Sequence, residues 1–307
     1  MTERSILVPE GLDGQRVDAA MSKLLGLSRT AAADICADGG VEMSGRPVIK
    51  SDRVIAGERL DIMMPEPKKP LEVVPDPVPG MRIVHDEDAF VVVDKPVGVA
   101  AHPALGWTGR TVVGGLAAAG FRIATSGAPE RQGIVQRLDV GTSGLMVVAK
   151  SEYAYSVLKR AFKERTVEKT YHAVVQGLPD PVLGTIDAPI ARHPKHDGLY
   201  AVRTEGKNAI THYEVIEAHR RAALVEIHLE TGRTHQIRVH FSATKHPCVG
   251  DLPYGADPVL AKELGLERQW LHAVKLGFQH PDTQKWVEFE SGYPEDLQIA
   301  LDRIRPN

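Results

Sequence analysis

The sequence predicts an α+β protein with a small N-terminal domain and a larger C-terminal domain. A chain of 307 residues is long enough for about two domains. Residues 65–80 hold six prolines in 16 positions, a composition typical of an extended linker. Beyond this stretch, strand-type runs outnumber helical patterns, which favours a large, mostly antiparallel mixed sheet flanked by helices and loops. We therefore expect domains at 1–64 and 81–307, joined by the linker 65–80.

Residues 1–64 are expected to fold as two short helices and a compact sheet. Apolar residues recur at helical spacing through 16–25, and Ser28 is suited to cap a second helix. The elements expected here are helices at 16–25 and 28–37 and strands at 41–43 and 59–63.

The C-terminal domain carries the strand-type runs. Its β-rich segments are separated by turn residues, and its helical patterns are few. The strands expected are 90–93, 145–149, 172–175, 212–216, 223–229 and 286–289, and the helices are 154–164, about 234–243, and a tail from 295.

Composition and charge exclude several classes of protein. The net charge of −3 gives no global positive field, so a polyanion would need a local basic patch. The two cysteines, Cys36 and Cys248, lack metal-binding or disulfide spacing, which favours a reducing, cytoplasmic location. No apolar segment is long enough to cross a bilayer, and the N-terminus lacks the apolar core of a signal peptide. We expect no membrane association.

A carboxylate stands at a turn before an apolar strand in the segment 133–150, GIVQRLDVGTSGLMVVAK. This turn presents Arg137 and Asp139 near the strand edge. Asp, Gly, Thr and Ser are common turn formers, so the tripeptide Arg-Leu-Asp by itself would indicate only a turn.

The whole segment resembles the signature of RluA-type pseudouridine synthases. The resemblance implies that Asp139 is the catalytic residue and that Arg137 helps to displace the target base. One position departs from the pattern, because Gln136 stands where many members have histidine.

Further segments resemble the family's other motifs in the same order. DKPVG at 94–98, with AHP at 101–103, resembles the first motif, which supports the active-site loop. KTYHA at 169–173 implies that Tyr171 packs against the target base, and LHA at 271–273 implies the same for Leu271.

The segment 229–240, LETGRTHQIRVH, and its continuation to 255 resemble a further motif. Helical spacing places Ile237 and Phe241 towards the core and leaves Arg238 free to point elsewhere. In the family this arginine pairs with the catalytic aspartate, and a guanidinium beside a buried carboxylate favours its ionised form. The same segment supplies two candidates for RNA contacts, Arg233 and His235.

The N-terminal domain resembles an S4-type RNA-binding domain. The resemblance is carried by residues 16–62, RVDAAMSKLLGLSRTAAADICADGGVEMSGRPVIKSDRVIAGERLDI. A one-sided cluster of cations could supply phosphate contacts, although a small interaction domain without RNA affinity remains an alternative. The candidate RNA-binding residues are Arg29, Arg46, Lys50 and Arg53.

Histidine density suggests a metal site, but the spacing opposes it. Eight of the 13 histidines fall between His193 and His246. The pairs at 193/196 and 235/240 lack complementary ligands, and Gln236 breaks the HExxH pattern. Between 192 and 246 nine Lys and Arg residues face six acidic ones, a local excess that suits a polyanion cleft. We expect no metal and no cofactor.

Together these resemblances imply a pseudouridine synthase, an isomerase, that acts on structured RNA. They are nearest to the RluD-like branch, which carries an N-terminal S4 domain and modifies large-subunit (23S) ribosomal RNA or its assembly intermediates. The target uridine is expected to flip into the cleft. There Asp139 would attack C6 or C1′, or assist departure of the base by removing the C2′ proton.

Tyr171 and Leu271 would then hold the detached uracil while it turns, and Tyr171 could also remove the C5 proton. We expect a monomer. Two alternatives stay open: a catalytically silent RNA-binding or ribosome-assembly factor, and a nucleoside or glycoside hydrolase, which commonly needs two carboxylates.

Overall fold

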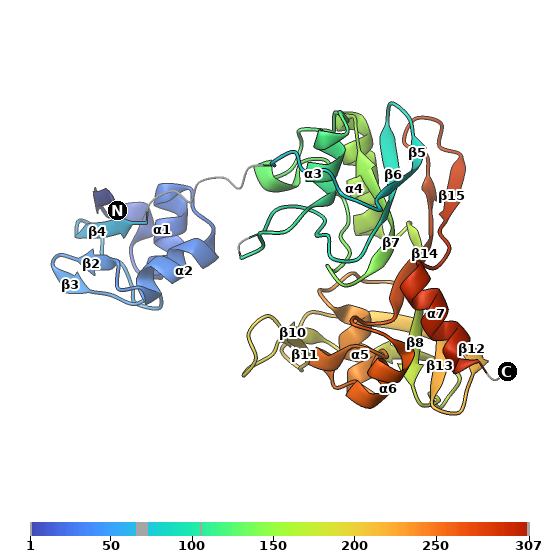
Figure 1. Cartoon of the computed structure of the whole chain (residues 1–307). Helices are drawn as coiled ribbons and strands as arrows, with labels where there is room; N and C mark the ends of the chain where they lie inside the picture. The colour runs from blue at the N-terminus through green and yellow to red at the C-terminus, as the bar shows by residue number, and fades with distance from the viewer. Residues whose placement is uncertain (1, 66–72, 105, 306–307) are drawn as a thin grey trace. The chain divides into compact units, whose positions relative to one another are not determined.

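The computed structural model describes residues 2–65, 73–104 and 106–305 (Figure 1). Contacts within the chain divide it into two compact units, with the division between residues 69 and 70. This point falls within the expected linker 65–80, of which residues 66–72 lie outside the described residues. Each unit is described by itself below.

The N-terminal unit is a four-stranded antiparallel sheet with two short helices. Its strand order is β1-β4-β2-β3. Ser28 caps the second helix, because its Oγ accepts a hydrogen bond of 3.1 Å from the Ala31 amide. The elements are β1 (Thr2–Leu7), η1 (Glu10–Leu12), α1 (Val17–Leu25), α2 (Arg29–Ala37), β2 (Val41–Met43), β3 (Arg46–Pro47) and β4 (Arg59–Met64).

Strands β1 and β3 had no signal in the sequence. Strand β1 pairs with β4 along its whole length, yet its residues, TERSIL, are mostly exposed and polar. An edge strand that buries almost nothing shows no alternation of apolar residues, which is the pattern that sequence analysis detects.

The C-terminal unit is built on a nine-stranded sheet with helices on both faces. The main path is β5-β6-β7-β14-β8-β13-β12-β9, and β15 pairs with β14. Its strands are β5 (Arg82–Asp86), β6 (Phe90–Lys95), β7 (Ser143–Ala149), β8 (Glu168–Gln176), β9 (Leu183–Asp187), β12 (Ile210–Ala218), β13 (Ala222–Leu229), β14 (Leu271–Gln279) and β15 (Trp286–Glu290), and β10 (Ile190–Arg192) pairs separately with β11 (Tyr200–Val202). The helices are α3 (Val112–Ala118), η2 (Pro129–Arg131), α4 (Glu152–Glu164), α5 (Gln236–Ala243), η3 (Leu252–Tyr254), α6 (Pro258–Leu264) and α7 (Glu295–Ile304).

Burial on both faces of the sheet explains the near-continuous apolar strands. Along β6, Val91 and Val93 join a core that includes α3 and α5, while Phe90 and Val92 join a second core that includes Leu158 of α4. Pairing between the named strands of this sheet is antiparallel except for β7 with β14. The expectation of a mostly antiparallel mixed sheet in an α+β fold is therefore confirmed.

The parallel contact between β7 and β14 lies at the centre of the sheet and depends on a glycine. Gly144 pairs with Ala273 and has a φ of 117°. A Cβ at Gly144 would lie 2.3 Å from the Ala273 carbonyl oxygen, so no side chain fits there. This junction brings the loop before β7 beside the first residue of β14, Leu271. Sequence analysis found the motif at 271–273 but missed the strand that it begins.

The described end of the proline-rich stretch packs on α3 of the second unit. The Asp76 amide donates a hydrogen bond of 3.2 Å to the Gly114 carbonyl. A Cβ at Gly115 would lie 2.8 Å from the Val78 side chain, so these segments are in close contact. Helix α3 has two glycines in seven residues, which is why no helix was expected there. No helix in the described parts of the chain has the length and apolar character needed to cross a membrane.

Candidate active site

Asp139 lies in the loop that leads into β7, at the centre of the sheet. The Thr142 amide donates to the Asp139 carbonyl at 3.0 Å, which closes a tight turn. Leu138 is buried and anchors this turn in the core, whereas Arg137 is exposed. The Asp139 side chain is mostly buried, with 15% of it exposed, and it lines a cavity.

Lys95 ties the Asp139 loop to the segment after β6. Its side chain is fully buried, and Nζ donates to the carbonyls of Val99 at 2.8 Å, Pro96 at 3.0 Å and Val140 at 3.5 Å. Burial lowers the pKa of Lys95 to about 7, and the nearby charge of Asp139 opposes that change. The segment 94–98, identified from sequence as a support for the active-site loop, contacts that loop through this lysine.

Arg268 fixes the other side of the loop. Its Nη1 donates to the Gly141 carbonyl at 3.2 Å and to Ser143 Oγ at 3.1 Å. The remaining nitrogens hold the Asp296 carboxylate at 2.7 and 2.9 Å, so the guanidinium is itself fixed. Arg268 had no role assigned from the sequence.

Arg238 of α5 stands opposite Asp139, and a second carboxylate fixes its position. Its Nη1 lies 3.5 Å from Asp139 Oδ2, while Nε and Nη2 donate to Asp251 at 2.6 and 2.9 Å. The guanidinium also stacks over the Tyr254 ring, with 4.7 Å from Cζ to the centroid. Burial lowers the pKa of Arg238, but the hydrogen bonds to Asp251 and the charges of Asp251 and Asp139 outweigh burial and raise it.

Asp251 is therefore, like Arg268, a member of the site that had no role assigned from the sequence. It is 1% exposed and holds Arg238 with two charge-assisted hydrogen bonds. Its only signal was its place inside the matched stretch that continues to 255, where a Gly-Asp pair precedes a turn.

His235 stands at the start of α5 in a left-handed conformation, with a φ of 55°. The helix consequently begins at Gln236 and not near 234 as expected. His235 Nδ1 contacts Tyr254 Oη at 2.7 Å, and Nε2 lies 3.9 Å from Asp139 Oδ2. Burial lowers the pKa of His235, although the charge of Asp139 acts in the opposite direction.

Tyr171 and Leu271 come from neighbouring antiparallel strands, β8 and β14. Tyr171 pairs with Ala273, which places it beside the start of β14. Both side chains are buried and line the same cavity as Asp139. Burial raises the pKa of Tyr171, and the negative charge of Asp139 adds to that rise.

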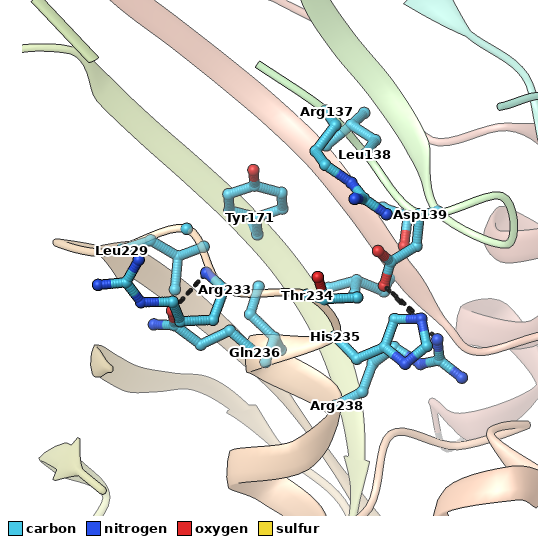
Figure 2. A pocket seen from close by; sticks show the side chains of 14 residues that line it. Arg137, Leu138, Asp139, Tyr171, Leu229, Arg233, Thr234, His235, Gln236 and Arg238 are labelled. Carbon is cyan, nitrogen blue, oxygen red and sulfur yellow. Dashed lines mark hydrogen bonds and ion pairs between the residues drawn. The ribbon is translucent and has the colours of Figure 1, made fainter. Parts of the chain in front are cut away.

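Three neighbouring cavities share residues around Arg137. The Asp139 cavity has a volume of about 70 Å³, and Figure 2 shows Asp139, His235 and Arg238 gathered at one end of it, with Arg233 at the other. Cavities of about 510 Å³ and about 300 Å³ adjoin it and share Arg137 with it. Arg137 therefore lies where the three spaces meet.

Arg233, a candidate for RNA contacts, lines the Asp139 cavity. The other candidates for RNA contacts lie in the N-terminal unit and are Arg29, Arg46, Lys50 and Arg53. There Asp18 organises the cations, since its carboxylate lies 3.0 Å from Arg16 Nε and 3.3 Å from Arg29 Nη2. The backbone carbonyl of Lys50 accepts a hydrogen bond from the Asp18 amide, and Arg53 forms a backbone bridge with Arg16. Arg46 lies on β3 opposite Met43, and no described contact joins it to the others.

The sequence drew attention to Gln136 and to the density of histidines, and the structure describes the surroundings of both. The Gln136 amide nitrogen is buried without a hydrogen-bond partner among the described residues. Within the same part of the chain, no cluster of three or more His, Cys, Asp or Glu side chains has the geometry to hold a metal ion.

Comparisons with known proteins identify the family of the chain. Residues 89–243 match the RNA pseudouridylate synthase family. An uncharacterized RNA pseudouridine synthase of Mycobacterium bovis is 60% identical over 99% of both chains. Ribosomal large subunit pseudouridine synthase D of Neisseria meningitidis serogroup B is 40% identical over 98% of this chain and 81% of its own.

The solved structures of two human proteins have a similar fold. The structure of human RNA pseudouridylate synthase domain containing 4 matches 73% of this chain and 94% of its own, with a TM-score of 0.57 and 26% identity. That of domain containing 1 matches 70% and 84%, with a TM-score of 0.55 and 32% identity. The chain therefore belongs to the RluA-type family of RNA pseudouridine synthases, and it is an isomerase.

Proposed function

We propose that this enzyme isomerises a uridine of large-subunit ribosomal RNA, in the cytoplasm, with Asp139 as the nucleophile. The observation that carries the assignment of Asp139 is its contact with Arg238 at 3.5 Å, at the end of a cavity that Tyr171 and Leu271 also line. The RNA substrate is supported by the Neisseria relative, whose name specifies the large ribosomal subunit.

The reaction requires that the target nucleotide leave its helix, because stacking hides both the base edge and the sugar carbon. Arg137 is suited to the space that the base vacates. It is exposed at the mouth of all three cavities, and no hydrogen bond or ion pair to the rest of the described chain holds its guanidinium.

In the site, the Asp139 carboxylate attacks C6 of uracil or C1′ of ribose, or assists departure of the base from C1′ by removing the C2′ proton. The N1–C1′ bond breaks, the uracil turns, and C5 bonds to C1′. Any bond to Asp139 breaks again, or the proton returns to C2′, the C5 proton is lost, and N1 gains a proton. Arg238 compensates the charge of the Asp139 carboxylate through Nη1 alone, because its Nε and Nη2 donate to Asp251. The Asp139 carboxylate therefore stays accessible to the substrate. Nothing is oxidised, and no cofactor enters the balance.

Tyr171 serves to stack against the base, and its hydroxyl is the candidate group for removing the C5 proton. Burial and the negative charge of Asp139 raise the pKa of Tyr171, so the phenol is neutral in the resting site. Leu271 supplies an apolar contact in the same cavity, so the uracil is held by surfaces that allow rotation.

We assign residues 1–64 to an S4-like RNA-binding domain, 65–80 to a linker and 81–307 to the catalytic domain. The order of the N-terminal elements, with two helices followed by a sheet around a turn, supports the S4 assignment. Lys50 and Arg53 are the candidates for phosphate contacts, with Arg29 and Arg46 as further ones.

The test is to map pseudouridines in ribosomal RNA from cells with and without this protein. We expect at least one large-subunit site to disappear and to return with the wild-type gene. A second assay follows tritium release from C5-labelled uridine in a large-subunit transcript. Tight RNA binding without tritium release would favour a silent assembly factor, and free uracil among the products would favour a hydrolase.

A further inference from the structure

A basic groove adjoins the Asp139 cavity, on the side away from Arg238. Its volume is about 510 Å³, and it shares Arg137, Tyr171 and Arg233 with the Asp139 cavity. The groove runs from the last turn of α4 across the first residues of β8 to the loop after β13. The cations that line it, besides Arg137, are Arg131, Lys163, Arg165, Lys169 and Arg233.

Only some of these cations are compensated by described acidic residues. Arg131 pairs with Glu130 at 3.5 Å. Glu230 is the acidic residue in the lining, and it is already shared between Arg165 at 3.1 Å and His212 at 2.8 Å. In the described chain, Lys163 and Lys169 have no carboxylate within ion-pair distance.

The surroundings of Lys169 make this lack of compensation costly. Its Nζ lies 5.9 Å from the centre of the Phe162 ring, in a half-buried position. Burial lowers the pKa of Lys169, and the positive charge of Arg165 lowers it further. An anion in the groove would relieve both effects.

We propose that this groove binds the phosphates of the RNA strand next to the flipped uridine and so sets the position of that strand. The proposal rests on the proposed function, since it takes RNA as the substrate. RNA is favoured over an acidic protein because the groove is continuous with the Asp139 cavity, and neighbouring phosphates of a nucleotide held there must lie close by.

The first experiment uses the full-length double variant Lys163→Gln/Lys169→Gln. Its matched control is Lys262→Gln/Lys285→Gln, which removes the same charge from exposed positions outside the three cavities. Two readouts are compared: kcat and KM for tritium release from the large-subunit transcript, and the Kd for a fluorescein-labelled 12-nucleotide single-stranded RNA at several salt concentrations.

We expect KM and Kd of the groove variant to rise about tenfold, with kcat at saturating RNA nearly unchanged. The slope of log Kd against log salt should fall by about 1 for each lysine removed. The control should stay within about twofold of wild type on both measures. Lys163→Arg/Lys169→Arg, which keeps the charge, should restore binding. Equal losses in the groove variant and the control, or an unchanged salt slope, would overturn the proposal and leave the groove for another polyanion, such as an acidic peptide.

The second experiment locates the strand. Both native cysteines, Cys36 and Cys248, are buried, so Lys163→Cys can be labelled selectively with a thiol-reactive photocrosslinker. Cross-links should fall on nucleotides adjacent to the modified uridine, whereas Lys262→Cys should give none there. Cross-links confined to distant nucleotides would contradict the proposal.

The two readouts test the binding groove and the identity of the substrate independently. If wild-type protein releases no tritium from the large-subunit transcript, the substrate assignment fails. The salt dependence of oligonucleotide binding still decides whether the groove binds RNA phosphates.

Discussion

The two ends of the active-site cleft differ in whether their cations have partners within the protein. At the Asp139 end, two buried cations have fixed partners: Arg238 is held by Asp251, and Lys95 donates to three carbonyls. At the groove end, Lys163 and Lys169 stand without carboxylates. Burying a charge without a partner is costly, so a cation left uncompensated beside a catalytic site indicates that the substrate supplies the anion. The compensated end fixes geometry, and the uncompensated end provides affinity.

The largest effect should come from the nucleophile itself. Asp139→Asn keeps the shape of the side chain but removes its charge, and we expect the rate of pseudouridine formation to fall by at least about a thousandfold. RNA affinity and the thermal unfolding midpoint should stay close to wild type, because the groove and core are untouched. Tritium release at a wild-type rate would refute the role of Asp139.

Asp251→Asn tests whether the Arg238 charge needs its buried partner. Removing one member of a buried ion pair leaves an uncompensated charge, so the free energy of unfolding should fall by about 3 kcal/mol in urea titrations. Asp257→Asn is the control, since Asp257 pairs with Arg221 at an exposed site, at 3.6 Å. That substitution should cost less than about 1 kcal/mol. Equal effects of the two changes would mean that burial of the pair does not matter.

Lys95 gives the compensated end a pH dependence. In the folded protein burial lowers its pKa to about 7 from the ordinary value of 10.5, so between these values the unfolded chain binds more protons. Stability from this residue therefore rises with pH across that interval, by at most about 1.4 kcal/mol per pH unit. The measurement is the difference in unfolding free energy between wild type and Lys95→Met from pH 7 to 10. Parallel curves would show that Lys95 is not the titrating group.

The smallest effect is expected in the N-terminal unit, where the same contrast recurs. Arg29 is neutralised by Asp18, whereas no described contact compensates the Lys50 side chain. Lys50→Gln should weaken binding of a large-subunit transcript by about threefold, and Arg29→Gln by less, with kcat unchanged in both. Filter binding at fixed salt measures the difference. A larger loss from Arg29→Gln would show that pairing within the unit does not predict RNA contact.

Local patterns were enough to identify most elements of the sheet and the loop that carries Asp139. The apolar runs of β6 and β7 and the Ser28 cap depend on neighbours in the sequence, and they are found where the sequence indicated. Among the strands that were missed, which also include β3, β5, β10 and β11, the strands β1, β9 and β14 obtain their stability from pairing with distant segments. Their own residues do not show a clear period, so only the assembled sheet reveals them.

The sequence by itself determined the chemistry available to this protein, because it specifies a glycine-containing turn with Asp139 and a short helix with Arg238. Only the tertiary structure decided how these groups act together. The β7–β14 junction brings segments more than a hundred residues apart next to each other. The Arg238 guanidinium contacts both Asp251 and Asp139. The groove likewise exists only because α4, β8 and the loop after β13 converge. Charge compensation depends on distance in space, and a linear order of residues does not contain that distance.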